Sequence, residues 1–212
     1  NRYSYVENNP IAFVDPTGEV IRFSGDFAKE ELYTMIQNLN EFTGNQYAVN
    51  DKNELVLVKE GENASKTATD FFNNLISSDR NYDVVRSEGK TRWNGKDAVE
   101  FNPKMFEGTT YPKGFNPVAM GLGAALTHEL FHLDTGIPDR APSGELIMNT
   151  GWTGKAVDFV NQIRKERNLP LRESYVADPG LKSGTFRLRF DHVNPSKPGK
   201  IYHVIMNEYW NK

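Results

Sequence analysis

The chain has 212 residues, a net charge of −3 and a sequence pI of about 5.9, so it lacks the broad basic field that binds nucleic acid. With 38% hydrophobic and 12% aromatic residues, it can bury the core of one domain, with or without an N-terminal tail. It has no cysteine, which excludes disulfides and cysteine-bound metal, and no apolar run near the roughly 18 residues of a membrane helix. We therefore expect neither nucleic-acid nor membrane partners.

Residues 1–18 read NRYSYVENNPIAFVDPTG and alternate aromatic with polar residues. Asn-Pro at 9–10 and Asp-Pro-Thr-Gly at 15–18 are turn signals. Taken alone, the segment predicts a strand and turns. The best boundary with the domain that follows lies near residues 18–25.

Residues 19–96 predict a globular lead-in of helices and short strands. Asp26 is placed to cap a helix from 27 to about 42, whose apolar residues recur at helical spacing, and Gly44 can end it. The other predicted elements are a hairpin of 47–49 with 55–58, a helix over 64–78, and strands over 82–85 and 98–101.

Residues 128–132 read HELFH, an HExxH motif that follows a stretch of small and apolar residues. Residues four apart share one helix face, so His128 and His132 can direct their imidazoles at one Zn²⁺. Glu129 can reach a water on that metal and act as general base. Two surface histidines would give the same bare pattern, but burying His, Glu and His together is costly unless a metal satisfies them. We therefore predict a zinc site.

A catalytic zinc site needs a third protein ligand and an open position. The helix is expected to end at Gly136, and the following turn can bring Asp139, eleven residues after His128, under the metal. Asp139 is thus the first choice, whereas Asp134 points to another face of the helix. The remaining candidate ligands are Glu145, Asp158, His192 and His203.

The C-terminal part predicts a helix over 157–167, ended by the Asn-Leu-Pro at 168–170, and a hairpin of 186–190 with 201–206. A basic cluster accompanies the helix. It forms either a solvated face or a contact for an acidic group of the substrate or the site, and it comprises Arg164, Lys165, Arg167 and Arg172.

The block from 128 to 175 resembles the bacterial effector zinc metallopeptidases of the NleD-like group. VEFNP at 99–103 is similar to the short strand and Asn-Pro ahead of their helix, and NQIRKERNLPLRESY at 161–175 to their downstream EN-x-x-R-x-E-x-x-L-P-x-R-x-x-Y. The family often has Glu where this chain has Val160, which keeps Asp139 and Asp158 as candidate ligands. The resemblance covers roughly residues 97–176. It implies an α+β fold with a single zincin-like metallopeptidase domain, built from an HExxH helix and small sheets or hairpins.

The run His-Glu-x-x-His-x-x-Thr-Gly-x-x-Asp, residues 128–139, is also similar to the NleC-like effector proteases. That resemblance implies that Asp139 binds zinc. It also implies that Tyr175 lies over the zinc, as a weak fifth ligand or as a donor to the oxyanion.

Residues 1–18 are similar to the closing motif of the Rhs/YD-repeat core, N-R-Y-x-Y-x-x-N-N-P-x-x-x-x-D-P-T-G. The resemblance implies a variable toxin domain that is released by cleavage just after the motif, with aspartates taking part. Here Glu19-Val20 follows, where a Leu is common. We expect three parts: the end of the Rhs core (1–18), a lead-in (19–96) and the catalytic region (97–212).

These observations predict a zinc endopeptidase toxin that is secreted or delivered into a target cell as a piece of a longer polypeptide. An Rhs shell upstream and an immunity protein are the expected partners, besides a protein or peptide substrate. Glu129 would take a proton from the zinc-activated water and return it to the leaving amine. Two alternatives remain: an inactive binding module with a structural zinc closed by four ligands, or a zinc hydrolase of a non-peptide amide.

Overall fold

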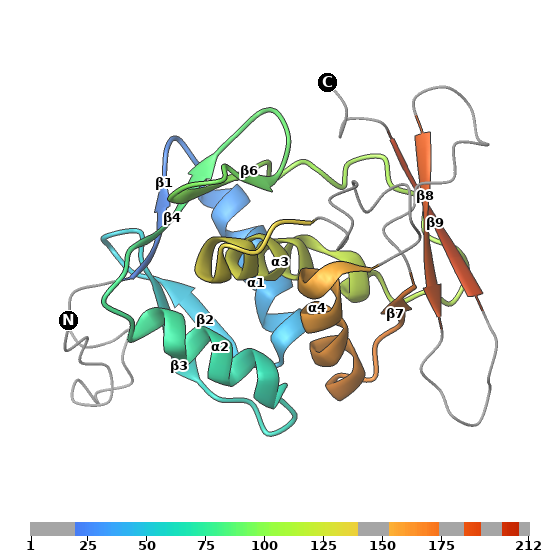
Figure 1. Ribbon diagram of the computed structural model, residues 1–212, viewed down its shortest axis with the longest axis horizontal. Coiled ribbons are helices and arrows are strands. Elements are labelled where there is room, and N and C mark those ends of the chain that lie inside the picture. The colour runs from blue at the N-terminus through green and yellow to red at the C-terminus, as the bar shows by residue number, and fades with distance from the viewer. Residues whose placement is uncertain (1–19, 140–152, 174–184, 192–200, 208–212) are drawn as a thin grey trace.

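A computed structural model describes residues 20–139, 153–173, 185–191 and 201–207 (Figure 1). These residues form an α+β fold, as predicted, with four α-helices and three small sheets. The helices are α1 (Lys29–Thr43), α2 (Lys66–Ile76), α3 (Leu122–Thr135) and α4 (Gly154–Glu166), with a 3₁₀ turn, η2 (Pro117–Met120), ahead of α3. None of the helices in the described ranges is long and apolar enough to cross a membrane. The predicted Rhs-core segment, 1–18, lies outside the described residues.

The largest sheet has four strands in the order β1-β4-β6-β5. β1 pairs with β4 and β4 with β6 in parallel, while β5 runs antiparallel to β6 at the edge. Their bounds are Ile21–Ser24 for β1, Tyr82–Arg86 for β4, Arg92–Trp93 for β5 and Ala98–Phe101 for β6. The predicted strands over 82–85 and 98–101 are confirmed, whereas β1 and β5 were not predicted.

Both predicted hairpins are confirmed and form the other two sheets. The first pairs β2 (Gln46–Val49) with β3 (Leu55–Lys59). The second pairs β8 (Thr185–Asp191) with β9 (Ile201–Asn207), and the short β7 (Leu171–Arg172) adds to β8.

The first residue of α1 differs from the sequence prediction. α1 begins after Ala28 and not after Asp26, because the side chain of Glu31 accepts the hydrogen bond of the Ala28 N–H at 3.0 Å. The cap is thus provided by an acidic residue three positions into the helix. The predicted end at Gly44 is confirmed, since this glycine has a φ of 83° and its N–H donates to Asn40 O.

Two core clusters meet at α3, the central helix in Figure 1. The first cluster joins α1, α2 and the four-stranded sheet to one stripe of α3, made of Leu122, Leu126, Leu130 and Leu133. The second joins η2, α4, β8 and β9 to Ala124 on another face of α3. α1 and α3 approach so closely that a Cβ at Gly123 would lie 2.4 Å from the carbonyl oxygen of Asn38. Packing on two sides therefore holds α3 rigidly in place.

Candidate metal centre

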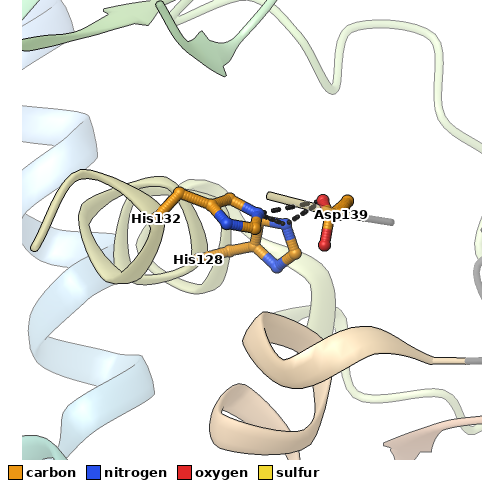
Figure 2. Close-up of side chains that lie close together, drawn as sticks. All are labelled: His128, His132 and Asp139. Atoms are coloured by element: carbon orange, nitrogen blue, oxygen red, sulfur yellow. Dashed lines mark hydrogen bonds and ion pairs between the residues drawn. The ribbon is translucent and has the colours of Figure 1, made fainter. Parts of the chain in front are cut away.

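The structure brings His128, His132 and Asp139 together beside the C-terminal half of α3 (Figure 2). Asp139 Oδ2 lies 3.1 Å from His128 Nε2 and 2.9 Å from His132 Nε2, and the two Nε2 atoms are 3.1 Å apart. The two histidines are only 7% and 4% exposed. Three ligand atoms therefore meet at one buried point.

The end of α3 explains how Asp139 reaches the histidines. Gly136 takes a φ of 65°, a conformation that favours glycine, and its N–H donates to His132 O at 2.8 Å. The chain reverses there, and Ile137 and Asp139 pass next to the face of α3 that carries the imidazoles. The residues after Gly136 thus supply both the third carboxylate and a backbone contact to the site.

That backbone contact orients His132. Its Nδ1 hydrogen-bonds the carbonyl oxygen of Ile137, an acceptor that requires the proton to be on Nδ1. In the neutral ring, Nε2 then carries the lone pair, and Nε2 is the atom that faces Asp139 and His128. A histidine that donates its other N–H to a carbonyl is the usual arrangement of a metal ligand.

The dimensions of the group fit a metal ion. A tetrahedral zinc with ligands at about 2.0–2.1 Å holds its ligand atoms about 3.3 Å apart. The observed edges of 2.9–3.1 Å are within a few tenths of an ångström of that value. The other carboxylate oxygen, Asp139 Oδ1, is buried and has no hydrogen-bond partner in the described part of the chain. The two nitrogens and one carboxylate can hold a metal ion, and the described residues contribute these three ligands to the group.

Without a metal, hydrogen bonds join the Asp139 carboxylate to the two imidazoles. Burial acts to raise the pKa of Asp139, but the hydrogen bonds from His128 and His132 outweigh it and keep that pKa well below its usual range. Burial acts to lower the pKa of His132, but the Asp139 carboxylate outweighs it and raises that pKa. The carboxylate and the imidazole therefore each favour the charged form of the other. A divalent cation would bind the ring nitrogens only in their unprotonated form.

Glu129 lies next to the group without belonging to it. The residue is 7% exposed, and its Oε2 accepts the backbone N–H of Trp93 at 2.7 Å. Burial raises the pKa of this carboxyl, while the charges of His128 and His132 and the Trp93 hydrogen bond act against the rise. α3 thus holds a buried carboxyl group beside the three ligand atoms.

Trp93, in β5, is the residue at this site that the sequence did not predict. Its indole stacks on the imidazole of His132, with ring centroids 6.3 Å apart and planes 16° from parallel. β5 has only two residues and carries no periodic pattern, so nothing in its own sequence marks it. Only the pairing of β5 with β6 brings it over α3.

Among the described residues, the other candidate ligands do not join the group. Asp158 is exposed on α4 and accepts a hydrogen bond from Thr153, and His203 is exposed on β9 opposite Arg189. Asp134, already set aside, accepts the hydroxyl of Tyr82 at 2.7 Å. Glu145, His192 and the predicted zinc-facing Tyr175 lie outside the described residues.

The basic cluster forms a solvated face only in part, because Lys165 is exposed while Arg164 is buried. Arg164 is 4% exposed and donates from Nε to Ala119 O at 2.8 Å and from Nη1 to Asn161 Oδ1 at 3.0 Å. Arg167 donates to the backbone carbonyls of Asn63 and Glu41. Both guanidiniums therefore hold neighbouring elements together.

The position where the NleD-like group often has Glu also serves packing here, because Val160 is 1% exposed in the second core cluster. A side chain at this position points into the second core cluster and not to the metal group.

Comparison with known proteins finds no family model, curated protein or solved structure that matches the chain.

Proposed function

We propose that the chain is a zinc-dependent endopeptidase in which His128, His132 and Asp139 bind Zn²⁺ and Glu129 is the general base. One observation carries the proposal. The buried carboxyl group of Glu129 lies beside the group formed by His128, His132 and Asp139 but is not one of its members. If the group only stabilised the fold, we would expect Glu129 to pair with it or to be exposed, because burying an acidic side chain is costly.

Each residue then has a distinct role. Zinc, when bound, polarises the attacked carbonyl and lowers the pKa of a water toward about 7. Glu129 accepts the proton of the attacking water and passes it to the nitrogen of the leaving amine. His132 is locked by Ile137 O, so its Nε2 needs no reorientation to bind.

The number of ligands supports a catalytic role over a structural one. Structural zinc sites are closed by four protein ligands, whereas catalytic sites use three and leave one position open. The described residues supply three to this group. Of the two candidates for a fourth ligand, His203 lies exposed on β9 and His192 lies outside the described residues.

The finer fold assignment and the biological context belong to the same proposal. We assign the domain to the zincin-like type, since its HExxH helix packs against β4, β5 and β6 of a mixed sheet. The Rhs-like segment at 1–18 makes it the toxin part of an Rhs-type protein, secreted or delivered into a target cell. A cognate immunity protein and an Rhs shell are then its partners, and a protein of the target cell is its substrate.

The decisive experiment compares wild type with Glu129→Gln, using Asp158→Asn as the matched control. Zinc is counted by elemental analysis, and new peptide termini in a treated lysate are identified by mass spectrometry. We expect one zinc per chain in all three proteins, with cleavage by wild type and Asp158→Asn. Activity of Glu129→Gln should fall about 10²–10⁴-fold.

Other outcomes would be equally informative. One tightly held zinc without cleavage by wild type would replace the protease by a binding module with structural zinc. Cleavage of small amide substrates, with no new peptide termini, would point to the non-peptide hydrolase. A protein without zinc under any condition would overturn the proposal.

A further inference from the structure

We propose that Trp93 is a positioning residue for this centre, whose backbone N–H fixes the Glu129 carboxylate and whose indole packs on the His132 ring. The inference rests on the proposed function, because it concerns the residues assigned as general base and metal ligand. Two different parts of one residue reach two different members of the site.

The direction of the Trp93 N–H follows from its place in the sheet. β5 is an edge strand, and Trp93 lies opposite Val99 in its ladder with β6. The next residue, Asn94, donates its N–H to Ala98 O, on the β6 side. Since successive N–H groups of a strand point to opposite sides, the Trp93 N–H points away from β6. It is therefore available to Glu129 without any loss to the sheet.

This hydrogen bond leaves the two oxygens of Glu129 unequal. Oε2 is taken by the Trp93 N–H, and Oε1 accepts no hydrogen bond from the described residues. A carboxylate held by one oxygen keeps the other in a fixed direction for proton transfer. Small errors in the position of such a group cost up to about 100-fold in rate.

The indole contributes a second restraint. It lies nearly parallel to the His132 imidazole, with ring centroids 6.3 Å apart, and the two nitrogens of that imidazole are directed at Ile137 O and at Asp139. The indole Nε1 is buried and has no hydrogen-bond acceptor among the described residues. The ring is therefore held by stacking and packing alone, so a phenyl ring can replace it without losing a hydrogen bond.

Three substitutions separate the two contacts. Trp93→Phe keeps a ring and the N–H, Trp93→Ala keeps only the N–H, and Trp93→Pro removes both. Proline is tolerated at an edge strand when the N–H is not used in the ladder. We expect Trp93→Phe to stay within about threefold of wild type in kcat. We expect Trp93→Ala to lose about tenfold in kcat, and Trp93→Pro about a further tenfold, with KM unchanged and one zinc retained.

A double-mutant cycle tests whether the N–H acts through Glu129. In the Glu129→Gln background, the step from Trp93→Ala to Trp93→Pro should leave the residual rate unchanged, because the base it positions is gone. An equal loss in both backgrounds would mean a general structural effect and would overturn the proposal. Wild-type kcat in Trp93→Ala and Trp93→Pro would overturn it as well. A Trp93→Phe variant as slow as Trp93→Ala would show that a ring at this position does not support His132 and would also contradict the proposal.

A readout independent of activity places the indole beside the metal. Cu²⁺ quenches nearby tryptophan, so its binding should reduce wild-type fluorescence, and Trp93→Phe should lack the quenched component. The chain has two other tryptophans, which provide the background signal. Quenching at Trp93 in a protein without peptidase activity would refute the proposed function and leave the contact standing. Activity in wild type without quenching at Trp93 would refute the contact itself.

Discussion

Helices α3 and α4 both bury polar side chains, yet they use them differently. On α3, His128 and His132 approach each other and share Asp139. On α4, the buried Arg164 binds the carbonyl of Ala119 in η2, and the exposed Glu166 accepts hydrogen bonds at the start of α2. Burial of a polar group is therefore not a sign of function by itself. Convergence of ligand atoms on one point is the sign.

The two helices also differ in how their buried charged groups are compensated. Burial lowers the pKa of Arg164 to about 9, with a smaller contribution from the charge of Arg172. The structure accepts this cost because a backbone carbonyl and a side-chain amide bind the guanidinium. In the α3 group the ligand side chains contact one another and the Ile137 carbonyl, and one buried carboxylate oxygen is left without a partner among the described residues. A metal ion would resolve that imbalance, and nothing comparable is needed on α4.

The largest effect should follow from removing a ligand on α3. His132→Ala should lower zinc affinity by more than about 100-fold and abolish activity, because a lost ligand exceeds the 10–100-fold cost of disturbing the residues around one. Competition with a coloured chelator measures the affinity. His203→Ala, which changes an exposed histidine on β9, is the control and should bind as wild type does. Equal affinity of the two variants would remove the distinction between the helices.

A substitution on α4 should lower the stability of the fold and leave zinc affinity unchanged. Arg164→Ala should lower the free energy of unfolding by about 3 kcal/mol, since it leaves a cavity and deprives Ala119 O of its donor. Urea unfolding of the metal-free protein measures the change, and zinc affinity of the folded protein should be unaltered. Lys165→Ala, at an exposed neighbour, should change stability by less than about 0.5 kcal/mol. A stable Arg164→Ala that fails to bind zinc would contradict the assignment.

Asp139→Asn sharpens the view of α3. The amide keeps the shape of the side chain but lacks the charge that draws zinc, so affinity should fall about 10-fold or more. Asp158→Asn, the exposed carboxylate of α4, is the matched control. Chelator competition on both proteins decides the matter, and an undiminished affinity of Asp139→Asn would exclude Asp139 as a ligand.

The smallest effect is expected at Glu166. Burial acts to raise its pKa, but hydrogen bonds from Ser65 and Thr67 outweigh it and lower the pKa to about 2. A depressed carboxyl pKa stabilises the fold above the unfolded value near 4.5, and this contribution is lost as the pH falls toward 2. Glu166→Gln should thus be slightly less stable at pH 7, by under about 1 kcal/mol because the side chain is exposed.

The check is a set of urea midpoints on metal-free protein between pH 7 and pH 2. The difference between wild type and Glu166→Gln should shrink as the pH falls from about 4.5 toward 2. A constant difference over that range would show that the carboxylate charge plays no part in capping α2.

Much of the fold was predictable because its signals are local. Helical spacing marked α1, α2 and α4, turn residues marked both hairpins, and glycines marked the ends of α1 and α3. Each of these signals acts within a few residues. The start of α1 was missed because two competing caps, Asp26 and Glu31, lie within one turn of it.

In the candidate site, too, local features were predictable and contacts between separate elements were not. The sequence by itself determined that His128 and His132 share a helix face and that Gly136 turns the chain back toward them, because pitch and glycine conformation are local properties. Only the tertiary structure decided that Asp139, and not Asp158, completes the group, and that Trp93 reaches Glu129. It also decided that Arg164 is buried while Lys165 beside it is exposed. The Trp93–Glu129 and Arg164–Ala119 contacts join residues 36 and 45 positions apart, so they depend on how the two core clusters pack around α3.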